Sequence, residues 1–224
     1  MARQHYKSPT ASAPAKGLHG PYGVFRNNGR LGSILVSLFI IEAMLTVFVI
    51  LLNQAVASAS LSLDANKLGE IIGITGWAQG ATRALVVVLF CLWLNRSCKN
   101  GWLLDAPKME TTPGLAVGYL FIPVLSLWKP FTTLKEIRNA SYGRHDALKT
   151  TLPLWWFLLL AFCLMAVVSS VLQQDGHSPE TLSIAEKLTI VSAPLTIVLD
   201  YLAITLVIGI TLAQHRRMSL WRTS

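Results

Sequence analysis

The sequence predicts an all-α integral membrane protein, with four transmembrane helices and a Pro-broken re-entrant or interfacial helical element between the second and third. Of the 224 residues, 53% are hydrophobic and only 13% are charged, about half the charged share of a soluble domain. Four apolar stretches reach the length that a membrane span requires. Lys and Arg gather on one side of these stretches. This composition excludes an ordinary soluble protein and a disordered chain.

Residues 1–30 precede the first predicted span, and they are rich in Ala, Ser, Pro, Gly and basic residues without periodicity. We expect a disordered basic cytoplasmic tail. Its positive charges either contact anionic lipid, at about 1 kcal/mol each, or only set the orientation of the chain. The apolar stretch 31–52 follows. Although Ala55-Val56-Ala57 resembles a cleavage site, the stretch is too long for a signal peptide, so we expect an uncleaved anchor.

The other predicted spans are 71–94, 152–172 and 188–212. Three of the four spans carry one charged residue near their midpoint: Glu42, Arg83 and Asp200. A charge at this depth costs about 2.5–3.5 kcal/mol on insertion scales, so we expect all three to face the bundle interior. We hypothesise that Arg83 pairs with Glu42, Asp200 or both. The cluster is then either a buried ion pair that fixes helix register or part of a proton or ion pathway.

Small residues mark one face in two of these spans. Spacings of four, three and four residues predict a helix-packing stripe at Gly69, Gly73, Gly76 and Gly80, with Arg83 three residues further on. In the fourth span we expect a kink at Pro194. The same spacing there predicts an inward face of Thr189, Ala193, Thr196, Asp200, Ala203 and Val207.

The distribution of Lys and Arg predicts the orientation of the chain. Sixteen of the nineteen lie before the first span, between the second and third, or after the fourth, where residues 214–224 form a second basic tail. Both termini are therefore expected in the cytoplasm, with the protein in the inner membrane. Counting the short apolar segment 114–128 as a span would move Arg216 and Arg217 to the other side and spoil this asymmetry.

The segment 114–141 is the predicted re-entrant or interfacial element. Thr112-Pro113-Gly114 predicts a turn, Pro123 interrupts the apolar run, and Lys129-Pro130 suits the start of a helix. That helix would be amphipathic and lie on the cytoplasmic interface. Its apolar face would carry Phe131, Leu134 and Ile137, and its polar face Thr132, Thr133, Lys135, Glu136 and Asn139. The segment is then either an elbow packed beneath the bundle or a docking surface or gate.

Residues 93–156 contain a long pattern of aromatic, proline, glycine and polar residues. It consists mainly of Trp93, Arg96, Asn100, Pro113, Gly114, Pro123, Trp128, Pro130, Glu136, Ser141, Trp155 and Trp156. This pattern resembles domain-of-unknown-function family 4328, a group of uncharacterised bacterial multi-span membrane proteins. Lys129 stands where the family has Arg, and Phe131 where it has Tyr, so no role that needs a bidentate guanidinium or a hydroxyl is expected there. The resemblance implies an architecture and no reaction.

Motifs of enzymes and of metal sites are missing from the sequence. There is no GxSxG, HExxH, Walker loop or dinucleotide fingerprint, so we expect no enzyme activity and no cofactor. Cys91, Cys98 and Cys163 form no CxxC pair and the histidines do not cluster near them, which argues against zinc. The basic runs lie beside spans, which favours lipid headgroups over nucleic acid as their partner.

Two functions follow as hypotheses. The first is a non-enzymatic docking or regulatory membrane component that acts through its cytoplasmic face, with anionic headgroups and a protein partner or second copy of the chain as partners. The alternative is a small transporter or channel that uses Glu42, Arg83 and Asp200. A water-filled path from these charges to a surface would favour transport. A dry charge cluster with an exposed groove around residues 121–138 would favour docking.

Overall fold

The computed structural model describes residues 19–57, 64–105, 109–143, 148–174 and 179–223. Four long helices dominate it: α1 (Gly29–Ala57), α2 (Ala65–Asp105), α5 (Thr151–Gln174) and α6 (Pro179–Thr223). Each is long and apolar enough to cross a membrane, and each contains one of the four predicted spans. The prediction of a mostly helical chain with four helices long and apolar enough to span a membrane is therefore confirmed.

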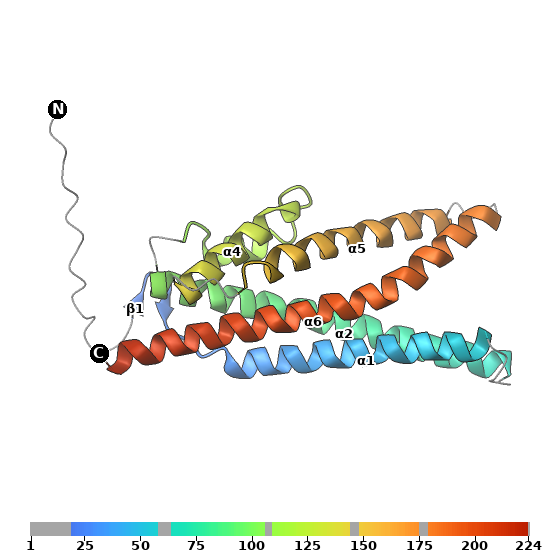
Figure 1. The fold of residues 1–224 in the computed structure, drawn as a ribbon, viewed down its shortest axis with the longest axis horizontal. Coiled ribbons are helices and arrows are strands. Elements are labelled where there is room, and N and C mark those ends of the chain that lie inside the picture. Colours follow the sequence, from blue (N-terminus) through green and yellow to red (C-terminus); the bar gives the residue numbers. More distant parts are fainter. Residues whose placement is uncertain (1–18, 58–63, 106–108, 144–147, 175–178, 224) are drawn as a thin grey trace, which may run out of the picture.

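Two of these helices are longer than a bilayer needs. α2 has 41 residues and α6 has 45, so they extend about 60 Å or more at 1.5 Å per residue, about twice the hydrocarbon thickness. Figure 1 shows both running the length of the molecule. The apolar pattern stops near residues 94 and 212, yet both helices continue because their polar extensions are buried against other elements.

Those other elements form a cap at one end of the bundle. The cap consists of β1 (His19–Gly20), β2 (Gly23–Val24), α3 (Pro113–Gly118), η2 (Leu125–Leu127) and α4 (Lys129–Tyr142). Figure 1 shows β1 and α4 at the end of the molecule where α6 finishes. We call the opposite end, where α5 ends and α6 begins, the far end.

The predicted N-terminal tail differs from expectation where the structure describes it. The disorder expected for residues 1–30 does not hold from His19 onward, because β1 and β2 pair as an antiparallel hairpin and Asn28 is buried; residues 1–18 lie outside the described part. The predicted C-terminal tail continues α6 as helix. Arg217 in that stretch donates to the carbonyl of Ala140 and lies 3.9 Å from Asp105, so it contacts protein.

The helical element predicted between the second and third spans consists of α3, η2 and α4. α4 packs against α2, α5 and α6. Leu134 and Ile137 of its predicted apolar face are buried. The assignment of Thr133 to the polar face was wrong, because its side chain is fully buried and its hydroxyl donates to Thr111 Oγ1 at 3.4 Å. Burial of a threonine is tolerated here because the hydroxyl has this partner.

The hydrophobic core lies where the cap joins the bundle, and α6 is its central helix. Trp93, Leu94, Leu134 and Ile137 are among the largest fully buried side chains. α6 packs against α1, α4 and α5. It approaches the cap closely at Gly209, where an added Cβ would lie only 2.7 Å from Tyr142 Oη.

α6 bends in its first half, the part that contains Pro194. A proline inside a helix lacks the amide hydrogen of its turn and its ring crowds the preceding turn, so a bend is expected there. In Figure 1, α6 follows α1 near the cap and then turns toward α5 at the far end. The pair α5/α6 thus separates from the pair α1/α2 toward the far end.

Candidate functional site

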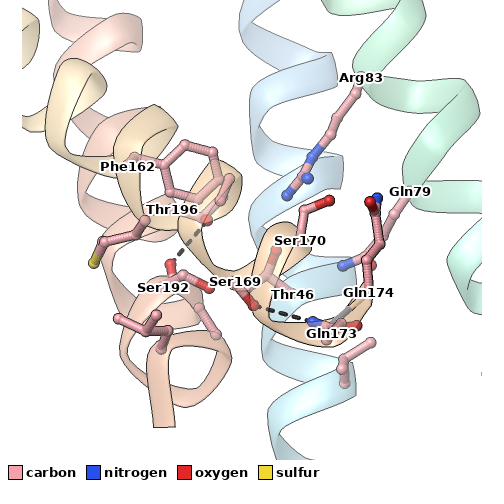
Figure 2. Close-up of a pocket in the computed structure, with 15 residues that line it drawn as sticks. Thr46, Gln79, Arg83, Phe162, Ser169, Ser170, Gln173, Gln174, Ser192 and Thr196 are labelled. Atoms are coloured by element: carbon pink, nitrogen blue, oxygen red, sulfur yellow. Dashed lines mark hydrogen bonds between the residues drawn. The ribbon is translucent and has the colours of Figure 1, made fainter. Parts of the chain in front are cut away.

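A cavity of about 570 Å³ lies between the four long helices where the two pairs separate, and we call it the vestibule. It extends from Arg83, near the middle of its span, to Gln174, the last residue of α5. Figure 2 shows side chains from all four helices turned toward it. Its polar lining consists of Thr46, Gln79, Arg83, Ser169, Ser170, Gln173, Gln174, Ser192 and Thr196.

An ion pair forms the inner end of the vestibule. Arg83 Nε on α2 donates to Glu42 Oε1 on α1 at 2.6 Å. Glu42 is only 5% exposed, whereas the Arg83 side chain is 49% exposed. The Arg83 guanidinium also lies 6.0 Å from the centre of the Phe162 ring on α5, within cation–π range. Arg83 therefore has its counter-ion behind it and the cavity in front of it.

Asp200 on α6 is the third charge of the predicted cluster. It is 6% exposed, and its Oδ2 atom is buried with no hydrogen-bond partner among the described residues. It does not line the vestibule but a separate apolar groove between α1 and α6, with Ala43, Met44 and Val47 of α1 among its neighbours. Of the three predicted charges, the structure pairs Arg83 with Glu42, and Asp200 takes part in no described ion pair.

The inward face predicted for α6 is found in the structure. Thr196, Asp200, Ala203 and Val207 are buried, and Ala193 lines the vestibule. The side chain of Thr189 lies outside the described part of the chain.

The glycine stripe of α2 meets no other element in the described part of the chain. A Cβ added at Gly69, Gly73, Gly76 or Gly80 would have no described heavy atom within 4 Å. The stripe therefore does not explain why Arg83 faces the interior, and a packing role for it stays a prediction about another molecule.

Several residues that carry the family resemblance hold the cap on the bundle. Asn100 of α2 is 1% exposed, accepts from Arg26 N at 3.1 Å and donates to Arg26 O at 2.9 Å and to Gln214 Oε1 at 3.0 Å. Gln214 of α6 donates onward to Ser97 O and to the hydroxyl of Ser141 on α4. This network joins Arg26, two residues after the end of β2, with α2, α4 and α6.

A second set of motif residues ties the connection after α2 to α4. Both Glu136 carboxylate oxygens accept hydrogen bonds, from the amides of Glu110 and Thr111 and from the Thr111 hydroxyl. Pro113 begins α3, and its carbonyl accepts from the Asn95 side chain at 2.9 Å. Glu136 thus satisfies backbone donors that would otherwise lack a partner.

The remaining residues that carry the family resemblance include four tryptophans, three of which are buried in the core. Trp93 is fully buried and donates to Thr211 Oγ1 at 3.0 Å. Trp155 and Trp156 are buried neighbours, and Trp156 Nε1 donates to Leu127 O at 3.1 Å. Trp128 precedes α4 and Pro130 lies in its first turn. Arg96 is half-buried, while Gly114 and Pro123 are exposed.

Most of the vestibule lining did not follow from the sequence pattern. Of its lining residues, only Arg83, Ala193 and Thr196 had been singled out. Gln214 of the network at the cap had not been singled out either. Two adjacent polar pairs, Ser169-Ser170 and Gln173-Gln174, were the available signal, because such pairs are unusual at the end of a span.

The described residues contain no group of three His, Cys, Asp or Glu side chains placed to hold a metal ion. The three cysteines are free. Cys98 is buried, and its thiol donates a hydrogen bond to Thr111 O at 3.3 Å.

Comparison with known proteins gives one family and no individual relative. The family described as "Domain of unknown function (DUF4328)" matches residues 57–212. No curated protein and no solved structure matches the chain. The match includes Arg83 and Asp200 but not Glu42. Because it spans more than half of the sequence and includes every residue that carried the resemblance, the chain belongs to the DUF4328 family.

Proposed function

We propose that this protein is a small, non-enzymatic transporter or channel component of the inner membrane, which admits a small polar or anionic solute into the vestibule. The observation that carries this proposal is the polar lining between the far end and the midplane ion pair. Polar side chains within spans are costly unless they face a water-filled cavity, where they mark solute pathways. With both termini in the cytoplasm, as the Lys and Arg distribution predicts, the vestibule would open to the outside.

Arg83 favours an anionic group in the solute. Its Nε donates to Glu42, and its two terminal nitrogens make none of the described hydrogen bonds. A guanidinium presents donors in a planar fork that matches carboxylate and phosphate oxygens. Hydroxyl and amide groups around the cavity would supply further donors and acceptors.

Thiol accessibility tests the vestibule without knowledge of the solute. In a chain whose three cysteines are replaced by alanine, Ser170→Cys should react with a water-soluble thiosulfonate in intact membranes. We expect an anionic reagent to react faster than a cationic one of similar size, because Arg83 attracts negative charge into the cavity. The rates are measured by mass spectrometry of the intact protein.

Matched variants give the controls. Adding Arg83→Gln should remove the preference for the anionic reagent while leaving the reaction itself. Val167→Cys, on α5 but not in the vestibule lining and 61% exposed, should face lipid and stay unmodified. If Ser170→Cys reacts no faster than Val167→Cys, the vestibule is closed to water and a transport function is excluded.

Docking through the cytoplasmic face is the second candidate, and one observation favours it. The segment around η2 leaves apolar side chains exposed, including Phe121 at 66%, Val124 at 65% and Leu127 at 53%. Such a surface suits a re-entrant or interfacial element in contact with anionic headgroups, or a contact with a protein partner or second copy. Nothing in the proposed function requires nucleic acid.

A photo-crosslinking amino acid at Val124 distinguishes these contacts in intact cells. If the segment docks a protein, we expect a defined protein adduct, detected by gel shift and identified by mass spectrometry, since an exposed side chain in an interface touches one partner. The same amino acid at Trp77, 84% exposed on α2, serves as the lipid-facing control. Lipid adducts alone at both positions would contradict docking.

A further inference from the structure

The apolar groove between α1 and α6, which we call the lateral groove, is a second cavity apart from the vestibule. Its volume is about 490 Å³, within the range of about 300–1,000 Å³ that is typical of ligand pockets. No described residue lines both cavities. Met44 and Leu51 of its lining are exposed. Because both belong to the first predicted span, the lateral groove opens to lipid.

Asp200 is the lining residue of the lateral groove whose side chain carries a charge near neutral pH. Its side chain is more than nine-tenths buried, and its Oδ2 atom has no hydrogen-bond partner among the described residues. Apart from Asp200 and Tyr201, the described side chains that line the groove are apolar. A buried carboxylate in apolar surroundings is costly unless an opposite charge pairs with it. The groove is therefore complementary in charge to a cation.

Two aromatic rings add to this complementarity. Phe48 of α1 and Tyr201 of α6 both line the lateral groove and are exposed, whereas Asp200 is buried and so lies deeper. The face of an aromatic ring attracts a cation, and rings that surround a cation are a known way of binding organic ammonium ions. A ligand in the groove would meet one ring from each helix and the carboxylate at the bottom.

The geometry points to a binding site for a lipophilic organic cation, such as a hydrophobic ammonium ion, in the lateral groove, with the Asp200 carboxylate as its counter-ion. The ligand is lipophilic because the groove opens to lipid and its walls are apolar. A small inorganic cation does not fit, because it needs several oxygen ligands and Asp200 is the one carboxyl among the described lining residues. This site is separate from the anion site proposed in the vestibule, so either can fail alone.

Binding of radiolabelled tetraphenylphosphonium, a lipophilic cation whose charge does not depend on pH, tests the proposal. The experiment uses the full chain in nanodiscs of zwitterionic phosphatidylcholine and measures binding by scintillation proximity. Empty nanodiscs give the part of the signal that comes from lipid. We expect saturable binding with one site per chain. Asp200→Asn should weaken the affinity about tenfold or more, because the buried counter-ion is lost.

Further variants separate the parts of the site. Tyr201→Phe should bind like the wild type and Tyr201→Leu about threefold or more weakly, because only the second loses the ring. Ala43→Phe should also weaken binding, since it adds bulk to the groove lining while Asp200 is kept. Glu70→Gln makes the same change from acid to amide at an exposed position on α2 outside the groove. It is the matched control and should leave the affinity unchanged.

The proposal is tested on variants that elute from size-exclusion chromatography like the wild type, and if Asp200→Asn does not, Tyr201→Leu and Ala43→Phe carry the comparison. Absence of saturable binding would overturn the site. Binding that Ala43→Phe weakens and Asp200→Asn does not would assign the groove to an uncharged apolar ligand, such as a lipid chain. In a chain without its native cysteines, near-complete disulfide dimers of Met44→Cys in intact membranes would assign the groove to a second copy. Both assignments would overturn the cation site.

Discussion

Trp93→Ala is expected to destabilise the protein by about 3–5 kcal/mol, the usual range for truncating a large buried aromatic side chain. The Trp93 side chain is fully buried where α2 meets the cap, with the Phe90 ring 5.6 Å away. Its loss would leave a cavity among residues of α2 and α6. It would also leave Thr211 Oγ1 without the donor that now lies 3.0 Å away.

Thermal denaturation in detergent, read as the fraction that still elutes as folded protein, measures this effect. We expect Tm to fall by about 10 °C or more. Trp93→Phe should retain most of the packing, and its Tm should fall by much less, because this variant loses mainly the hydrogen bond. Trp77→Ala is the matched control, because Trp77 lies on the same helix and is 84% exposed. Equal decreases in Tm for Trp93→Ala and Trp77→Ala would contradict the burial of Trp93 in the hydrophobic core.

Asn100→Leu is expected to have an effect of similar size by a different route. Asn100 is 1% exposed. Its side chain accepts a hydrogen bond from the Arg26 amide and donates to the Arg26 carbonyl and to Gln214 Oε1. A leucine of similar volume would leave buried donors and acceptors unsatisfied, at about 1–3 kcal/mol each. Because the Arg26 contacts hold the segment after β2 on the bundle, that segment should also become sensitive to trypsin at Arg26.

A double-mutant cycle separates the network from general packing. Asn100→Leu and Gln214→Leu should together cost less than the sum of the single changes, since each single change leaves the other partner unsatisfied. Tm and the rate of trypsin cleavage at Arg26 are the two measurements. Asn66→Leu, at an exposed position in the first turn of α2, is the control and should change neither. Strict additivity would contradict a direct contact between Asn100 and Gln214.

The location of each span could be predicted because the signal for it is local. Hydrophobicity over about 20 residues decides whether a helix can cross a bilayer, so each span predicted by hydropathy lies within one long helix. The actual lengths of α2 and α6 could not be predicted in this way. Their extensions are polar, and they stay helical because residues such as Asn100 and Gln214, 114 positions apart, satisfy each other.

The contrast between local signals and tertiary contacts also explains which features of the candidate site could be predicted. Depth along a span follows from counting residues, so Glu42, Arg83 and Asp200 could be placed near one level. Which carboxyl pairs with Arg83 depends on how α1 and α6 are rotated and spaced around α2. The small-residue spacing on α2 predicted packing, but those glycines meet no described part of the chain, because spacing shows what a helix face permits and not what lies opposite it.

By itself, the sequence determined the membrane class, the four spans, the family and the shared depth of three charges, since each depends on composition or on order along the chain. The tertiary structure decided that Arg83 pairs with Glu42, that Asp200 Oδ2 has no partner among the described residues, and that a polar cavity opens between the helix pairs. These features depend on the course of α6, which packs along α1 near the cap and turns away at its bend. A cavity is a property of how helices diverge, and no single helix encodes it.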